Sequence, residues 1–170
     1  MIFLGIGSNL PSVYGDRFKN IDLSIEYLLE EKIKLIKKSS FYETPSYPDR
    51  KHPRYINIVI SIETNFTPEK LADVILKIEK KLGRKRNKKN DPRTCDIDII
   101  DYEGKCINFK FNDSEFLLPH KEIANRNFVL YPLKEICSNW KHPITNELIN
   151  VLIKKLSIEE KNSILMINKS

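Results

Sequence analysis

Two acidic residues one position apart, Asp96 and Asp98, form the sharpest chemical signal in the sequence. They alternate with Ile97 and Ile99, a pattern that predicts a strand over residues 95–102. Alternate strand residues share a face and lie roughly 6.5 Å apart, so both carboxylates should enter one space while the isoleucines face the core. Carboxylates this close repel one another unless a cation lies between them. Paired carboxylates are suitable ligands for magnesium. Two such ions could bind both the attacking and the leaving oxygen of an in-line displacement.

Basic residues precede this acidic pair. Residues 84–89 read Arg-Lys-Arg-Asn-Lys-Lys, and Arg93 stands three positions before Asp96. Taken alone, a basic run is equally well a solvated loop, and an Asp-x-Asp is more often the exposed face of an edge strand. Together, metal-binding carboxylates and guanidinium groups are what a polyphosphate requires. The combination favours a polyphosphate as ligand.

The common nucleotide and metal motifs do not account for this combination. Residues 5–10 read Gly-Ile-Gly-Ser-Asn-Leu, with leucine where a dinucleotide-binding loop needs its third glycine. The sequence has no G-x-x-x-x-G-K-[ST] loop and no G-x-S-x-G elbow, and its three histidines lack zinc-site spacing. Of these, His120 is compatible with either a phosphate contact or a structural role.

Composition places the chain among globular proteins. Its 170 residues are 41% hydrophobic and 31% charged, which fits one domain spanning 1–170. The net charge of +6 favours anionic partners. No apolar run is long enough to span a bilayer, the first residues do not resemble a signal peptide, and the three cysteines lack C-x-x-C spacing. We expect a cytoplasmic protein with free, buried cysteines and no membrane partner.

Hydrophobic periodicity predicts the elements that position these residues. Strands are expected near residues 2–7, 33–42, 55–63 and 95–102, with one helix capped by Asp16 and another beginning at Thr67-Pro68. This β-α-β-β-α-β order predicts an α+β, ferredoxin-like antiparallel sheet with helices on one face. A hairpin returning through 107–111 and helices near 128–137 and 145–156 should form a C-terminal extension.

The strand over 55–63 indicates which sheet face is available. Isoleucine occupies every second position from 56 to 62, so these four side chains should face the core. Tyr55 and Asn57 must then project from the opposite face, which we expect to be free.

Together these segments resemble the 6-hydroxymethyl-7,8-dihydropterin pyrophosphokinases of folate biosynthesis. The matching pieces are residues 5–10, 39–45, 55–57, 79–86, 92–99 and 118–128. The resemblance implies transfer of the β,γ-pyrophosphoryl unit of ATP to the pterin hydroxymethyl oxygen, with release of AMP. It also implies that the chain binds ATP and the hydroxymethyl dihydropterin, without nucleic acid, and we expect a monomer.

The resemblance assigns roles to individual residues. Asp96 and Asp98 would hold two magnesium ions and, with Arg84 and Arg93, form the catalytic set. The ATP site would comprise Glu79, Arg84, Arg86, Arg93, Ile99, His120 and Arg126, with Glu79 and Ile99 near the ribose and adenine. The pterin would lie between Tyr55 and Phe128, its ring edge contacted by Asn57, Thr44 and Pro45.

The chain also departs from the family pattern. The Arg-Trp pair usual in the basic loop is replaced by residues 88–91, Lys-Lys-Asn-Asp, and Lys121 stands where tyrosine is common. We therefore expect a charge-dominated closure and salt-sensitive ATP binding. Two alternatives stay open: a ferredoxin-like RNA-binding module, and an inactive family member that serves as a partner-binding domain.

Overall fold

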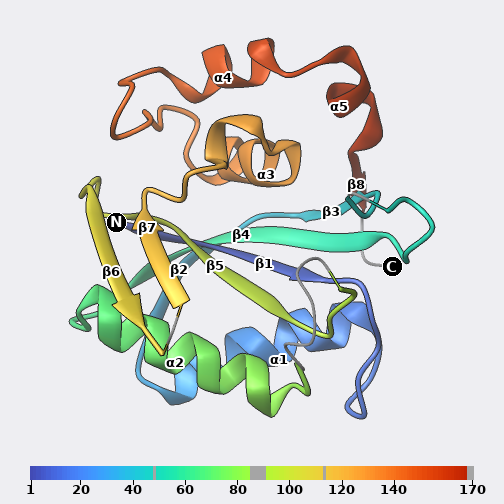
Figure 1. Ribbon diagram of the computed structural model, residues 1–170, viewed down its shortest axis with the longest axis vertical. Helices are drawn as coiled ribbons and strands as arrows, with labels where there is room; N and C mark the ends of the chain where they lie inside the picture. Colours follow the sequence, from blue (N-terminus) through green and yellow to red (C-terminus); the bar gives the residue numbers. More distant parts are fainter. Residues whose placement is uncertain (48, 85–90, 113, 168–170) are drawn as a thin grey trace.

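The structure is a computed structural model that describes residues 1–47, 49–84, 91–112 and 114–167 (Figure 1). Its first half contains β1 (Ile2–Ser8), α1 (Arg17–Glu30), β2 (Lys34–Lys38), β3 (Phe41–Thr44), β4 (Tyr55–Glu63), α2 (Pro68–Lys81) and β5 (Asp96–Tyr102). Its second half contains β6 (Ile107–Phe111), β7 (Ser114–Leu118), a 3₁₀ turn η1 (Ile123–Asn125), α3 (Asn127–Ile136), α4 (Ile149–Lys155), α5 (Ile158–Ser163) and β8 (Leu165–Ile167).

An antiparallel sheet forms the centre of the fold. Its strands follow the order β5-β1-β4-β3-β8, and β2 also pairs with β4. The predicted strand over 33–42 is divided into β2 and β3, which pair with opposite ends of β4. At the break between β2 and β3, Ser39 takes over the hydrogen bonds of a regular strand pair. Its N–H donates to the Val59 carbonyl, and its Oγ accepts from the Val59 N–H, both at 3.0 Å.

Helices α1 and α2 cover one face of the sheet (Figure 1). Both begin where the sequence predicts, because the side chains of Asp16 and Thr67 accept hydrogen bonds from backbone N–H groups of the first turn. The four isoleucines of β4 are buried against these helices, as predicted. This larger hydrophobic core fixes which face each residue of β4 and β5 presents.

The opposite face is not free, and the prediction of helices on one face alone is wrong. Helices α3 and α4 lie there (Figure 1) and form a second buried cluster with Phe3, Val59 and Ile100 of the sheet. The physical reason is strand alternation: these three apolar side chains point away from α1 and α2 and require their own cover. Tyr55 and Asn57 lie on this face beyond the covered part and line a cleft.

The prediction that residues 107–111 form a hairpin with β5 is also wrong. Strand β6 pairs with β7 in a separate two-stranded sheet, where Phe109 stacks on Phe116 at 5.0 Å. Residues Glu103 and Gly104 do form a turn with positive φ, but the chain leaves the main sheet there.

The remaining C-terminal elements differ from prediction in length and in number, because α5 and β8 follow the helix that was expected to be the last. The helix expected over 128–137 corresponds to α3, whereas the one expected over 145–156 begins later, as α4. All three cysteines are free, but burial was wrongly predicted for Cys106, which is exposed. The helices of the described segments are too short or too polar to span a bilayer.

Candidate active site

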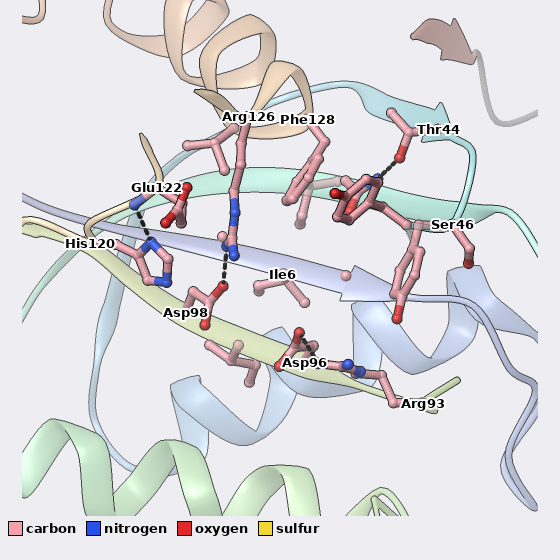
Figure 2. A pocket seen from close by; sticks show the side chains of 18 of the residues that line it. Ile6, Thr44, Ser46, Arg93, Asp96, Asp98, His120, Glu122, Arg126 and Phe128 are labelled. Carbon is pink, nitrogen blue, oxygen red and sulfur yellow. Dashed lines mark hydrogen bonds and ion pairs between the residues drawn. The ribbon is translucent and has the colours of Figure 1, made fainter. Parts of the chain in front are cut away.

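A cleft of about 1150 Å³ opens where β1, β4 and β5 approach the start of α3 (Figure 2). It exceeds the roughly 300–1,000 Å³ usual for a site that binds one small molecule. The predicted residues that line it are Thr44, Pro45, Tyr55, Asn57, Glu79, Arg84, Arg93, Asp96, Asp98, His120, Arg126 and Phe128. The structure thus brings together residues from six separate segments of the chain.

Strand β5 presents both acidic residues to this cleft, as the alternation predicts. Asp96 and Asp98 are partly exposed, whereas Ile99 lies in the core beneath α1 and α2. The carboxylate of Asp96 pairs with Arg84 Nη1 at 2.6 Å and with Arg93 Nη1 at 2.7 Å. Two guanidinium groups therefore converge on one acidic residue at the bottom of the cleft.

Glu79 supports this arrangement from α2. The residue is only 2% exposed, its Oε1 accepts from the Ile97 N–H at 2.8 Å, and it forms an ion pair with Arg84. The accepted hydrogen bond comes from the residue between the two aspartates. Glu79 thus couples α2 both to the strand that bears the acidic pair and to one of the arginines facing it.

Asp98 lies on the cleft wall between His120 and Arg126 (Figure 2). Arg126 Nη1 is 3.3 Å from its Oδ2. Desolvation by the surrounding walls, followed by repulsion from Asp96, raises the pKa of Asp98 above its ordinary value. A cation bound beside the two carboxylates would offset both effects.

His120 presents one ring nitrogen to the cleft. Its Nδ1 accepts a hydrogen bond from the Glu122 N–H at 3.2 Å, so in the neutral ring Nε2 carries the proton. Burial lowers the pKa of His120, although Asp98 opposes this shift. A neutral N–H donor facing the cleft is suited to a phosphate oxygen.

The acidic pair fits magnesium by its donor chemistry. Magnesium prefers oxygen ligands and is commonly held by one or two carboxylates, with water and substrate phosphates completing its shell. Within the described segments, no group of three or more His, Cys, Asp and Glu side chains could hold a metal ion. A site built from Asp96, Asp98 and a bound polyphosphate is compatible with both observations.

The other end of the cleft is aromatic and amide-lined. Asn57 is 5% exposed and donates from Nδ2 to Thr44 Oγ1 at 3.0 Å. Tyr55, two residues earlier on β4, and Phe128 at the start of α3 also line the cleft, and burial raises the pKa of the tyrosine. This end offers ring faces and amide groups for a flat polar molecule.

The Gly-Ser-Asn sequence at the end of β1 connects the two ends. Ser8 Oγ donates to the Thr94 carbonyl at 2.7 Å, and Asn9 Oδ1 accepts from the Arg93 N–H at 2.7 Å. Asn9 Nδ2 reaches Ser46 Oγ at 3.2 Å and the Pro53 carbonyl at 3.1 Å. These residues therefore fix the backbone of Arg93 and the loop that follows β3.

Several cleft residues escaped prediction. Sequence reasoning missed Ser46, Tyr47, Arg50, Ile75, Leu76, Ser114, Glu115, Phe116, Glu122, Glu160 and Ser163. The alternating aromatics of β6 and β7 were the only available signal, and they point to the hairpin that carries three of these residues. Arg86 and the replaced loop residues 88–90 lie outside the described residues, so their predicted roles stay predictions.

Comparison with known proteins identifies the family. The family described as 7,8-dihydro-6-hydroxymethylpterin-pyrophosphokinase (HPPK) matches residues 3–138. The chain belongs to the HPPK family. It is 36% identical over 135 residues to 2-amino-4-hydroxy-6-hydroxymethyldihydropteridine pyrophosphokinase of Methylorubrum extorquens, covering 79% of this chain and 80% of that one. It is 37% identical to the protein of the same name from Aquifex aeolicus, covering 84% of each.

A solved HPPK structure shares the fold. The HPPK-DHPS protein of Plasmodium falciparum, crystallised with pterin and p-hydroxybenzoate, superposes with a TM-score of 0.75 at 17% identity. The superposition covers 99% of this chain and 47% of that one, so this chain spans about half the length of that HPPK-DHPS protein. At this identity, the similarity supports the arrangement of helices and sheet.

Proposed function

We propose that the chain transfers the β,γ-pyrophosphoryl group of ATP to the hydroxymethyl oxygen of 6-hydroxymethyl-7,8-dihydropterin, as a step of folate biosynthesis. The observation that carries this proposal is the acidic pair Asp96 and Asp98, which faces a cleft containing Arg84, Arg93 and Arg126. Membership of the HPPK family and the names of its relatives support the same reaction.

The proposed reaction is a single displacement at the β-phosphorus. The hydroxymethyl oxygen forms a bond to that phosphorus, the bond to the α,β-bridging oxygen breaks, and AMP leaves with that oxygen. The hydroxyl proton passes to solvent, and we assign no side chain as general base. Arg84, Arg86, Arg93 and His120 bind and orient the phosphates, and Arg126 lies near both substrates. Positioning and charge neutralisation supply most of the acceleration.

Asp96 and Asp98 are the proposed ligands of two magnesium ions. When bound, the ions neutralise the phosphate charge and polarise the reacting oxygens. Asp96 also pairs with Arg84 and Arg93. The same two guanidinium groups line the cleft and would bind phosphate oxygens of ATP bidentately.

The pterin is proposed to lie at the aromatic end of the cleft. Tyr55 and Phe128 would cover its two ring faces, and Asn57 with the Thr44-Pro45 backbone would contact its edge. An amide side chain offers both a donor and an acceptor, as an aminopyrimidinone edge requires. The ribose and adenine would then lie near Glu79 and the backbone of Ile99, because the side chain of Ile99 lies in the core.

We also propose that residues 1–170 form one catalytic domain with ferredoxin-like topology. Two hydrophobic clusters cover opposite faces of one sheet, which supports a single folding unit. The strand order β5-β1-β4-β3 with antiparallel pairing supports the ferredoxin-like assignment.

The experiment that tests this function follows the label of [γ-³²P]ATP incubated with magnesium, the hydroxymethyl dihydropterin and the protein. The proposal predicts equal amounts of AMP and labelled pterin diphosphate, dependent on both magnesium and the pterin. Label appearing only in inorganic phosphate, or no AMP above background, would reject it. Magnesium-independent RNA binding with a steep salt dependence would instead favour the RNA-binding alternative.

A further inference from the structure

Residues 157–167, at the end of the described chain, border the proposed pterin end of the cleft. This C-terminal arm consists of the Ser157 cap, α5 and β8, and it lies beyond residues 3–138 that match the family. Figure 1 shows α5 descending from the helical layer to β8, which pairs with the edge of β3. None of the α5 residues is buried, so polar contacts rather than core packing hold this helix in place.

The central polar contact comes from Asn127, the first residue of α3. The residue is 7% exposed, and its Nδ2 donates to the Glu160 carbonyl at 2.6 Å and to Ser163 Oγ at 3.0 Å. Ser163 Oγ in turn donates to the same carbonyl at 3.0 Å. A nearly buried amide therefore connects the start of α3 to two residues of the arm.

A second contact connects the arm to the main sheet. Arg54 Nη2 lies 3.4 Å from the Ser163 carbonyl, and its Nε donates to Glu43 of β3 at 2.9 Å. Arg50 also pairs with Glu159 of α5. The arm is thus attached on both sides of the cleft rim, to α3 and to the segment between β3 and β4.

The start of α3 packs on the second hydrophobic cluster through Phe128, Val129 and Leu130, but it lacks a side-chain cap. Its N-cap residue, Arg126, makes no capping hydrogen bond from its side chain. Phe128, on the other side of Asn127, lines the cleft, and the Arg126 guanidinium lies 5.5 Å from its ring centroid. The residue held by the arm therefore lies between the two residues that the proposed function places against the substrates.

We infer that Asn127, with Glu160 and Ser163 of the C-terminal arm, is a positioning residue that fixes the Phe128 ring for the aromatic substrate. This inference rests on the proposed function for the identity of that substrate. The phosphate-binding arginines Arg84 and Arg93 lie on other segments, so the arm should affect pterin binding far more than ATP binding.

The test compares Asn127→Asp and Ser163→Ala with a matched control, Asn65→Asp. Asn65 is exposed and follows the opposite end of β4. In Asn127→Asp, a carboxylate oxygen replaces the amide donor and faces the Glu160 carbonyl. The lost or repelled hydrogen bonds predict a pterin KM about tenfold higher in this variant and about threefold higher in Ser163→Ala. The ATP KM should stay within about twofold in both, and Asn65→Asp should match wild type.

A double variant separates positioning from general loosening. If Asn127 acts through Ser163, then Asn127→Ala combined with Ser163→Ala should raise the pterin KM by less than the product of the single effects. Equal rises in both substrates' KM, or wild-type pterin KM in folded Asn127→Asp and Ser163→Ala, would overturn the inference. If Asn127→Asp does not fold, the pterin KM of the milder Ser163→Ala variant decides the question, and a wild-type value there overturns the inference.

Direct pterin binding keeps this inference distinct from the proposed function. The dissociation constant of the hydroxymethyl dihydropterin is measured by its fluorescence, with a non-hydrolysable ATP analogue and magnesium present. A wild-type protein that binds the pterin but releases no AMP would reject the reaction while leaving the arm testable. If the wild type is active and the arm variants bind the pterin with its affinity, the positioning role of the arm is rejected and the proposed reaction is not.

Discussion

Replacing Glu79 should destabilise the protein through a mechanism visible in the structure. In Glu79→Ala, the buried Ile97 N–H loses its acceptor. Arg84, whose side chain is 15% exposed, loses one of the two acidic partners that it has among the described residues. Removing one partner of a buried ion pair costs about 3–5 kcal/mol. Because Arg84 keeps Asp96, we expect the lower end, about 3 kcal/mol. In Glu79→Gln, an oxygen still accepts from Ile97, so about 1–2 kcal/mol is expected.

Urea unfolding measured by circular dichroism checks these values. Glu26→Ala, which removes an exposed carboxylate of α1 that is 3.7 Å from Lys19, is the control and should cost less than about 1 kcal/mol. The free energy of unfolding of the two Glu79 variants should separate clearly, with alanine the less stable. If Glu79→Ala lies within about 1 kcal/mol of wild type, the coupling of α2 to the acidic strand is not as described.

Two further predictions concern other parts of the molecule. A Cβ on Gly7 would lie 3.1 Å from Asn57 Oδ1 and 3.5 Å from the Tyr55 ring, so Gly7→Ala should raise the pterin KM several-fold; steady-state kinetics showing no rise would contradict this. Burial lowers the pKa of His142 in the folded protein. As the pH drops, this histidine therefore takes up a proton in the unfolded chain before it does so in the folded one, and stability should fall below about pH 6.5. This fall, measured by urea unfolding from pH 7.5 to 5.5, should be smaller in His142→Asn, and equal falls would refute the assignment.

Local patterns in the sequence predict the geometry of the acidic pair and of β4. Alternation alone places Asp96 and Asp98 on one face and Ile97 on the other, because strand periodicity depends on no distant partner. The caps at Asp16 and Thr67 are local for the same reason. Those features agree with the structure, and twelve of the predicted site residues line the cleft, although Ile99 lies in the core.

Features that depend on distant partners were not predictable in the same way. Val59 and Ile100 signal a second apolar face, but only the three-dimensional arrangement identifies α3 and α4 as its cover. The separation of β6 from β5 depends on a competing partner, β7, whose pairing brings Phe109 onto Phe116. The contact of Asn127 with the arm joins residues more than thirty positions apart and has no periodic signature.

The central claim is that the acidic pair on β5 acts in pyrophosphoryl transfer. The most direct test is the rate of AMP release by Asp96→Asn and Asp98→Asn at saturating ATP, magnesium and hydroxymethyl dihydropterin, with circular dichroism to verify folding. Asp73→Asn on α2, whose acid pairs only with nearby lysines in the described contacts, is the control. We predict a loss of about a hundredfold or more in each β5 variant and a wild-type rate in the control. A folded Asp96→Asn or Asp98→Asn protein that releases AMP at the wild-type rate would contradict the account.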